Sequence, residues 1–251
     1  MSLETGWLQA PFKKVMQPLA HKLWDLKVVG LENIPKTGPA LITPNHVAFI
    51  DSVFITTLMP RRTLAVGKSD YMDSWKTKFL FPATGMIPID RAGGSASQAA
   101  LDAAAASLER GDLFLIYPEG TRTRTGYLHK GRTGAARLAL RTGAPIIPVG
   151  IRGTDRIQPV DTVKPVTGVP CEIHIGRPID VSRYRNRQDD RRVLRQITDE
   201  VMFEVAELSG QTYVDVYASD PLPDSVAPQA PPVVLTGSSG HHRSESMAAS
   251  A

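Results

Sequence analysis

A histidine and an aspartate lie close together in a mainly apolar stretch of the chain, T-P-N-H-V-A-F-I-D at residues 43–51. Histidine titrates near neutral pH, so His46 could take the proton from an acceptor hydroxyl as that hydroxyl forms a new bond, a step worth about 10²–10⁴ in rate. A carboxylate such as Asp51 that accepts the other ring N–H fixes the tautomer and stabilises the imidazolium. The pair therefore predicts a general base with its orienting acid. The structural alternative is a buried histidine followed by an aspartate that caps a helix.

The spacing of this pair limits the local structure. On an ideal helix, two side chains five positions apart point about 140° away from each other. His46 and Asp51 can therefore meet only where the chain turns. We expect His46 directly after a strand and Asp51 in the first turn of the helix that follows.

Three further segments carry candidate site residues. They are G-M-I-P-I-D-R at 85–91, Y-P-E-G-T-R at 117–122 and A-P-I-I-P-V-G at 144–150. A guanidinium binds a phosphate monoester through two parallel hydrogen bonds, which a lysine cannot do, so Arg91 and Arg122 could hold a phosphorylated substrate. The alternative is that these arginines pair with Asp90 and Glu119 at the surface.

Together with N-H-x-x-x-x-D, these segments resemble the glycerolipid acyltransferase family, which contains the 1-acylglycerol-3-phosphate acyltransferases. That family has four such blocks in the same order with similar gaps, and the resemblance covers roughly residues 26 to 180. It implies that His46 and Asp51 are catalytic. It also implies a group of residues that bind or shape the site of the acceptor's phosphate: Arg91, Glu119, Gly120, Thr121, Arg122 and Lys130. Asn45 is expected to support the site, and Pro148 to shape the apolar wall of the acyl site. The chain departs from the family's usual residues at Tyr117, where Phe is common.

The reaction implied by the resemblance is transfer of a fatty acyl group from acyl-CoA or acyl-carrier protein to the free hydroxyl of 1-acylglycerol-3-phosphate, giving phosphatidate. The same chemistry on another lysophospholipid or a glycolipid is an alternative. A non-catalytic lipid-binding protein is an alternative of another class, which the His46–Asp51 pair disfavours because a binder needs no base.

No covalent nucleophile is required for this reaction. Cys171 lies in an expected strand and the sequence has no G-x-S-x-G elbow, so direct attack of the acceptor hydroxyl on an acyl thioester remains. We expect backbone N–H groups near these loops to stabilise the oxyanion. The sequence contains no cluster of metal-binding residues, and we expect no cofactor beyond the acyl donor as co-substrate.

The composition is that of a globular protein with a bias towards anionic partners. The chain has 251 residues, of which 42% are hydrophobic and 22% charged, and a net charge of +4. Residues 61–132 hold 11 Lys and Arg against 7 Asp and Glu, which accounts for the whole excess. Phosphates and acidic lipids fit this bias. Nucleic acid does not, because the basic residues are scattered among apolar ones and no aromatic stacking platform is evident.

Strand and helix patterns alternate along the chain, which predicts an α/β fold with a mostly parallel central sheet flanked by helices. Apolar runs typical of strands covered on both faces occur at D-L-F-L-I-Y-P and P-I-I-P-V-G-I. Helices are expected at 51–59, 71–81, from about 95 to 110, and at 133–142. A closing amphipathic helix is expected from the spacing of its apolar residues: Val193, Ile197, Val201, Val205 and Leu208.

The two ends of the chain differ from the expected catalytic domain at 26–216. Residues 1–25 predict an amphipathic helix with apolar residues at steps of three and four, Leu8, Phe12, Val15, Leu19 and Leu23, and lysines among them. Such a helix could contact a membrane surface or pack on the domain. No secretory signal or spanning segment is expected, so the protein would act as a peripheral enzyme at the cytoplasmic face of a membrane. Residues 217–251 have the composition of a disordered tail.

Overall fold

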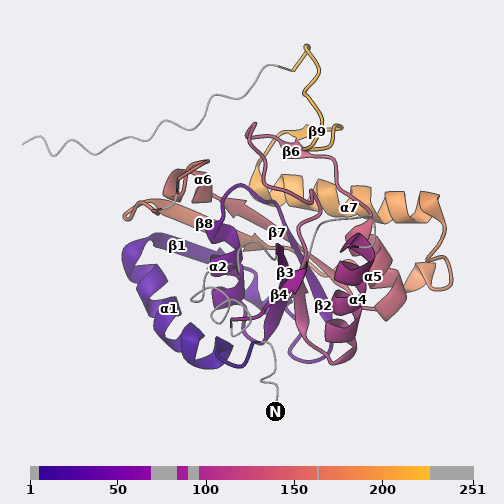
Figure 1. Ribbon diagram of the computed structural model, residues 1–251, viewed down its shortest axis with the longest axis horizontal. Helices are drawn as coiled ribbons and strands as arrows, with labels where there is room; N and C mark the ends of the chain where they lie inside the picture. Colours follow the sequence, from indigo (N-terminus) through magenta and orange to yellow (C-terminus); the bar gives the residue numbers. More distant parts are fainter. Residues whose placement is uncertain (1–5, 69–83, 90–95, 163, 227–251) are drawn as a thin grey trace, which may run out of the picture.

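The computed structural model describes residues 6–68, 84–89, 96–162 and 164–226. Its centre is a seven-stranded sheet with the order β1-β8-β7-β2-β5-β3-β4 (Figure 1). The strands are β1 (Asp25–Val29), β2 (Ala40–Pro44), β3 (Thr63–Lys68), β4 (Met86–Ile89), β5 (Leu113–Leu115), β7 (Ile146–Arg152) and β8 (Pro170–Ile175). All neighbouring strands pair in parallel except β7 and β8. The α/β fold with a mostly parallel sheet is thus confirmed.

Helices cover both faces of this sheet. They are α1 (Gln9–Leu23), α2 (Ile50–Leu58), α4 (Ala96–Glu109), α5 (Gly134–Thr142), the short α6 (Thr154–Ile157) and α7 (Arg191–Ser209). Apolar residues of α1 and α2 pack on one face of the sheet, and those of α4, α5 and α7 on the other. Successive strand residues therefore enter different cores, as Leu41 and Ile42 of β2 do. This explains why the central strands are apolar at every position.

The parallel pairing brings two chemically important segments to the same edge of the sheet. β2 and β5 are neighbours in register, with Ala40 opposite Leu113. The segment after β2 leads through His46 to α2, and the segment after β5 begins the Y-P-E-G-T-R motif. The carboxyl ends of parallel strands are where loops form ligand sites in such sheets.

The closing helix α7 contains all five apolar residues from which it was predicted, and four of them are buried: Val193, Ile197, Val201 and Val205. Asp190 caps its start by accepting hydrogen bonds from Arg192 N and Val193 N, and Gly210 ends it in the left-handed conformation. Two features were not predicted: the antiparallel direction of β8, and a small sheet in which β6 (Leu128–His129) pairs with β9 (Tyr213–Val214). The helix expected at 71–81 lies outside the described residues.

Helix α1 docks on the domain through polar side chains. The Gln9 amide hydrogen-bonds both backbone groups of Thr63, and Lys13 Nζ donates to Met59 O at 2.8 Å and Arg61 O at 2.6 Å. Burial lowers the pKa of Lys13 to about 8. The inward face therefore carries these polar side chains beside the apolar Ala20 and Leu23, and only part of the apolar face that the periodicity indicated packs on the domain.

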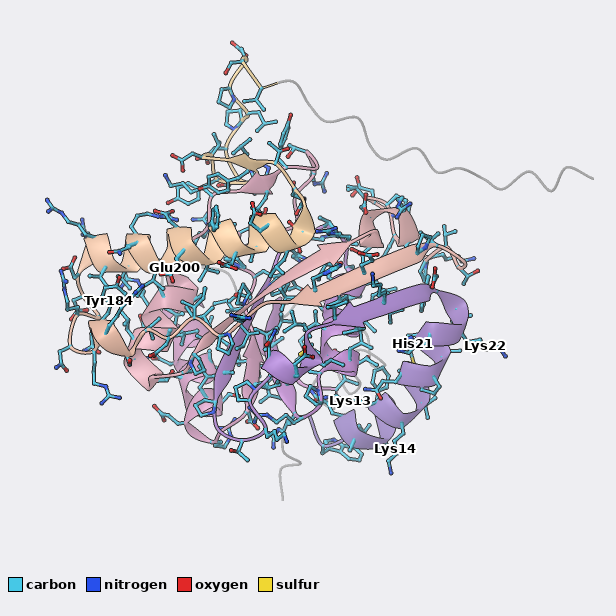
Figure 2. The ribbon with its side chains drawn as sticks, turned by 180° about the vertical axis from the view of Figure 1, so that it is seen from behind. Lys13, Lys14, His21, Lys22, Tyr184 and Glu200 are labelled. Atoms are coloured by element: carbon cyan, nitrogen blue, oxygen red, sulfur yellow. The ribbon has the colours of Figure 1, made fainter. Side chains whose placement is uncertain are left out.

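Two apolar residues of α1 lie on its outer side. Val15 is 65% exposed and Leu19 38%, and Trp7, just before the helix, is 42% exposed. Lys14 and Lys22 lie on the same outer side of the helix (Figure 2). Within the described residues, no helix combines the length and the apolar character needed to cross a membrane.

Candidate active site

The turn after β2 holds the candidate base and its orienting acid together. His46 follows β2 and Asp51 lies in the first turn of α2, as the spacing required. The distance from His46 Nδ1 to Asp51 Oδ2 is 3.0 Å, and the Asp51 side chain is completely buried. Asp51 carries no donor when ionised, so Nδ1 carries the hydrogen and Nε2 has a free lone pair. No described residue hydrogen-bonds Nε2, and the imidazole is 15% exposed.

Asp51 also shapes the backbone of this turn. Its Oδ2 accepts from Val47 N at 2.8 Å and Ala48 N at 2.9 Å, and the Gln158 side-chain oxygen accepts from Ile50 N. These backbone N–H groups are engaged and cannot stabilise an oxyanion without breaking a bond. The turn at residues 45–51, the histidine turn below, is therefore built to orient the imidazole.

An aromatic ring fixes the plane of the imidazole. The Tyr117 and His46 rings stack with centroids 3.7 Å apart and an interplanar angle of 12°. The Tyr117 hydroxyl is 2.9 Å from Ser52 Oγ, next to Asp51 in α2. Burial, with a contribution from the Asp51 charge, raises the pKa of Tyr117 well above its usual value, so the hydroxyl is neutral. Ser52 lies in the first turn of α2 and makes this contact from there.

Glu119 joins two backbone segments through hydrogen bonds. Its carboxyl oxygens accept from His46 N at 3.1 Å and from His129 N at 3.0 Å. Burial raises the pKa of Glu119 to about 7, against the opposing effect of these two hydrogen bonds. Since the side chain is 1% exposed, Glu119 shapes the site and does not pair with Arg122.

The loop that carries this motif, residues 118–132, presents a guanidinium that no described residue binds. Gly120 has a φ of 80°, which favours glycine, and a Cβ there would lie 3.1 Å from the Arg132 side chain. Thr121 is exposed, and Arg122 is half-buried. Among the described residues, Arg122 has no hydrogen-bond or ion-pair partner. It is therefore available to an anionic ligand.

Lys130 is already paired. Its Nζ lies 2.9 Å from Asp215, and the side chain is 26% exposed. The hydrogen bond from Lys130 is the main reason why the pKa of Asp215 is lowered. Lys130 adds positive charge as expected, but a phosphate would have to compete with Asp215 for it.

The remaining predicted site residues have different positions. Asn45 is fully buried and its side chain hydrogen-bonds both backbone groups of Ile151, so it ties the histidine turn to β7. Pro148 is buried within β7, opposite Thr43 of β2. Pro148 is therefore part of the central sheet, and its role in shaping an acyl site stays a prediction. Arg91 lies outside the described residues.

Comparisons with known proteins identify the family of this chain. A sequence model named Acyltransferase matches residues 25–152, which include the histidine turn and the 118–132 loop. The chain belongs to the acyltransferase family. It is 27% identical over 190 residues to a chloroplastic 1-acyl-sn-glycerol-3-phosphate acyltransferase of Arabidopsis thaliana, covering 69% of this chain and 51% of the relative. It is 28% identical to a 1-acyl-sn-glycerol-3-phosphate acyltransferase of Borreliella burgdorferi, covering 61% of each.

The acyltransferase spans about half to three fifths of the length of these relatives. A solved structure also resembles it, that of the 1-acyl-sn-glycerophosphate acyltransferase PlsC of Thermotoga maritima. The TM-score is 0.61 at 24% identity, covering 80% of this chain and 79% of the other. This likeness supports the fold.

Some residues of the acyltransferase site were not anticipated from the sequence. Tyr117 was noted only as a departure from the family pattern, and its stacking on His46 gave no separate signal. His129 is buried in the 118–132 loop with Nδ1 3.1 Å from Val216 O and Nε2 2.7 Å from Thr125 Oγ1. Since a carbonyl can only accept, Nδ1 carries the hydrogen and Nε2 accepts from Thr125, so this histidine is structural.

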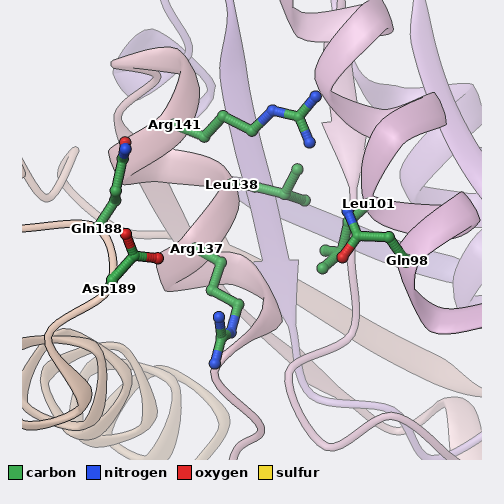
Figure 3. A pocket seen from close by; sticks show the side chains of 7 residues that line it. All are labelled: Gln98, Leu101, Arg137, Leu138, Arg141, Gln188 and Asp189. Atoms are coloured by element: carbon green, nitrogen blue, oxygen red, sulfur yellow. The ribbon is translucent and has the colours of Figure 1, made fainter.

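A separate pocket of about 320 Å³ lies between α4, α5 and the segment before α7 (Figure 3). Gln98, Arg137 and Arg141 line it, and Arg141 is paired with Asp102 at 2.5 Å. None of the residues that line it belongs to the histidine turn or to the 118–132 loop. It is not part of the candidate active site.

Proposed function

We propose that this acyltransferase moves a fatty acyl group from the thioester of CoA or acyl-carrier protein to the free hydroxyl of 1-acylglycerol-3-phosphate, giving phosphatidate. The observation that carries the proposal is the His46 imidazole, held at Nδ1 by Asp51, with an Nε2 that no described residue hydrogen-bonds. The names of the curated relatives, 1-acyl-sn-glycerol-3-phosphate acyltransferases, support the choice of acceptor.

The proposed reaction is a direct transfer. His46 Nε2 takes the proton of the acceptor hydroxyl while its oxygen attacks the thioester carbonyl. Asp51 stabilises the imidazolium that forms. When the tetrahedral intermediate collapses, the carbon–sulfur bond breaks and the imidazolium returns the proton to the leaving thiolate. No step of this sequence requires a cofactor.

The acceptor's phosphate is assigned to Arg122, and Arg91 is its proposed second ligand. Arg122 is half-buried and without a partner among the described residues, on the same loop as Glu119, which accepts from His46 N. A guanidinium fits a phosphate monoester through two hydrogen bonds. A lysophospholipid with a diester head group would use the same arginine less well, which favours lysophosphatidate.

The test is release of CoA from acyl-CoA in the presence of 1-acylglycerol-3-phosphate. The wild-type protein should release CoA and form phosphatidate, and His46→Ala should abolish both while keeping its circular-dichroism spectrum. If CoA release depends on a lysophospholipid with a diester head group, and not on lysophosphatidate, the acceptor is that lysophospholipid. Near-wild-type turnover by His46→Ala would overturn the mechanism.

The outer side of α1 is the proposed contact with the membrane surface. Both acyl substrates partition into bilayers, while the thioester carrier reaches the enzyme from water, so we place the enzyme at the cytoplasmic face. Trp7, Val15 and Leu19 are exposed beside Lys14 and Lys22. Burial of each such apolar side chain contributes about 1.5–3 kcal/mol, and each lysine near anionic lipid about 1 kcal/mol. These contributions are enough for reversible association.

Flotation with vesicles that contain anionic lipid tests this contact. The wild-type protein should float at low salt and be partly released at high salt. A double variant, Val15→Ser with Leu19→Ser, should float less, because it loses exposed apolar surface and no docking contact. Phe203→Ser on α7, where the phenylalanine is 64% exposed, is the matched control. Equal loss of flotation in both variants would contradict a specific role of α1.

A further inference from the structure

The chain that follows α7 lies against the candidate active site. Residues 211–219, the C-terminal strap below, run beside the 118–132 loop, and β9 pairs with β6 there (Figure 1). Leu128 N donates to Thr212 O at 3.0 Å and Lys130 N to Val216 O at 3.0 Å. The strap lies outside the part of the chain, residues 25–152, that matches the family.

One side chain of the strap connects both halves of the site. The Gln211 side-chain oxygen accepts from Asn45 Nδ2 at 2.7 Å, and its Nε2 donates to Gly126 O at 2.8 Å. Asn45 directly precedes His46, and Gly126 lies in the 118–132 loop. A single amide group therefore spans the distance between the histidine turn and the loop that carries Arg122.

The bond to Asn45 completes a buried polar group. The Asn45 side-chain oxygen accepts from Ile151 N at 2.7 Å, and its Nδ2 donates to Ile151 O at 3.0 Å. Gln211 takes the second hydrogen of Nδ2. Since Asn45 is fully buried, the loss of Gln211 would leave that hydrogen without an acceptor and loosen the start of the histidine turn.

The rest of the strap holds the basic side chains of the loop. Asp215 pairs with Lys130 at 2.9 Å, and the Arg132 guanidinium lies 4.9 Å from the centre of the Tyr217 ring. Ser219 Oγ accepts from Arg132 at 3.3 Å. The strap is thus in contact with the loop on both sides of β6, and Gln211 is its contact with the histidine turn.

We propose that Gln211 is a positioning residue of the acyltransferase, which acts beside the bonds of Glu119 to His46 N and of Thr123 N to His46 O in fixing the separation between the His46 base and the Arg122 phosphate site. The proposal rests on the proposed function. If the proposal is correct, the C-terminal strap helps to position the groups of the active site. An error of about 1 Å between base and acceptor is enough to lower turnover substantially.

Two variants separate the two hydrogen bonds of Gln211. Gln211→Met has a similar length and makes neither bond. Gln211→Glu keeps an acceptor for Asn45 and cannot donate to Gly126 O. Gln17→Met is the matched control, because Gln17 makes a similar bond to Thr57 O at 2.9 Å, between α1 and the end of α2 that is remote from Asp51.

We expect Gln211→Met to lower kcat/KM for the acceptor about tenfold, with the KM of the acyl donor within about twofold of wild type. Gln211→Glu should keep most of kcat and raise the acceptor KM. Hydrogen exchange of peptides within residues 120–132 should be faster in both variants and unchanged in Gln17→Met. Equal changes for donor and acceptor, accompanied by a lower Tm, would mean that Gln211 only stabilises the fold and would overturn the proposal.

The hydrogen-exchange measurement does not depend on turnover. If the wild-type protein transfers no acyl group and the loop still exchanges faster in the Gln211 variants, the proposed function fails and the positioning contact stands. If the loop exchanges at the wild-type rate and acceptor kinetics do not change, the positioning role is wrong whatever the reaction is.

Discussion

The histidine turn and the 118–132 loop are held in place in different ways. In the histidine turn, Asp51 binds the imidazole and two backbone N–H groups of its own turn, so the hydrogen bonds that orient the base lie within seven residues. The loop is also held by the C-terminal strap, more than 80 residues later in the chain. Arg122, its candidate ligand for phosphate, is left without a partner among the described residues.

This difference separates catalysis from substrate binding. A base must be oriented before the acceptor arrives, so its imidazole is held by a carboxylate of the same turn. A phosphate ligand must keep its donors free, so its loop has to be supported from outside. Changes in the histidine turn should therefore alter kcat, and changes in the loop or the strap should alter the KM of the phosphorylated acceptor.

The largest effect is expected for Asp51→Asn. The asparagine can present its amide to His46 Nδ1, which leaves the hydrogen on Nε2 and removes the base. We expect kcat to fall about 10³- to 10⁴-fold, as for loss of the carboxylate in other triads, with little change in donor affinity. Steady-state kinetics and a binding titration with a non-hydrolysable acyl-CoA analogue measure the two quantities. A change in KM alone would mean that Asp51 contributes to substrate binding and not to catalysis.

Glu119, which joins the two regions, gives a pH-dependent stability. Its pKa is raised from 4.5 to about 7, so the folded protein keeps a proton that the unfolded chain releases between these values. Stability should therefore fall as pH rises from about 4.5 to about 7, by up to about 3 kcal/mol from this group. Glu119→Gln cannot titrate, so the difference between its unfolding free energy and that of wild type should change over this range. Parallel denaturation curves at all pH values would contradict the raised pKa.

Arg122→Lys tests whether the 118–132 loop binds the phosphate of the acceptor. The variant keeps the charge but loses the two-pronged guanidinium contact, so the KM of lysophosphatidate should rise about tenfold while that of the acyl donor changes far less. Arg124→Lys, in the same loop, is the control, because Arg124 is exposed and pairs with Asp161 at 3.4 Å. An equal rise for both substrates would mean that Arg122 supports the fold or the donor.

Loss of the Tyr117 ring that stacks on His46 should have a smaller effect, a decrease in kcat. Tyr117→Leu removes the π face that stabilises the imidazolium and fixes its plane, so kcat should fall about three- to fivefold. Tyr117→Phe keeps the ring and loses only the contact with Ser52, so it should recover most of this loss. If both variants lose the same activity, the hydroxyl matters and the stacking does not.

Much of this architecture follows from patterns that a sequence displays locally. Val193 to Leu208 predict α7 because apolar residues every three or four positions need a core to cover them. The five-residue spacing of His46 and Asp51 predicts the turn between strand and helix. The bidentate geometry of a guanidinium predicts a phosphate ligand for Arg122, and no described residue binds this side chain.

Other features depend on contacts that no local pattern records. Part of the inward face of α1 is polar because backbone carbonyls, which have no sequence signature, accept from Lys13. Asp215 and Gln211 meet Lys130 and Asn45 only because the parallel sheet and α7 return the chain to the same edge. Because these partners lie far apart in the sequence, the contacts of the strap could not be predicted before the fold was known.

The smallest predicted effect concerns the pair between the strap and the loop. Lys130 can reach an acceptor's phosphate only if it leaves Asp215, whose side chain is 70% exposed. An exposed pair of this kind contributes less than about 1 kcal/mol, so Asp215→Asn should lower the acceptor KM about two- to threefold and leave kcat unchanged. Asp161→Asn, which frees Arg124 instead, is the matched control and should have no effect. A higher acceptor KM in Asp215→Asn would show that the pair positions Lys130 for the phosphate, and the strap would then support substrate binding through Asp215 as well as Gln211.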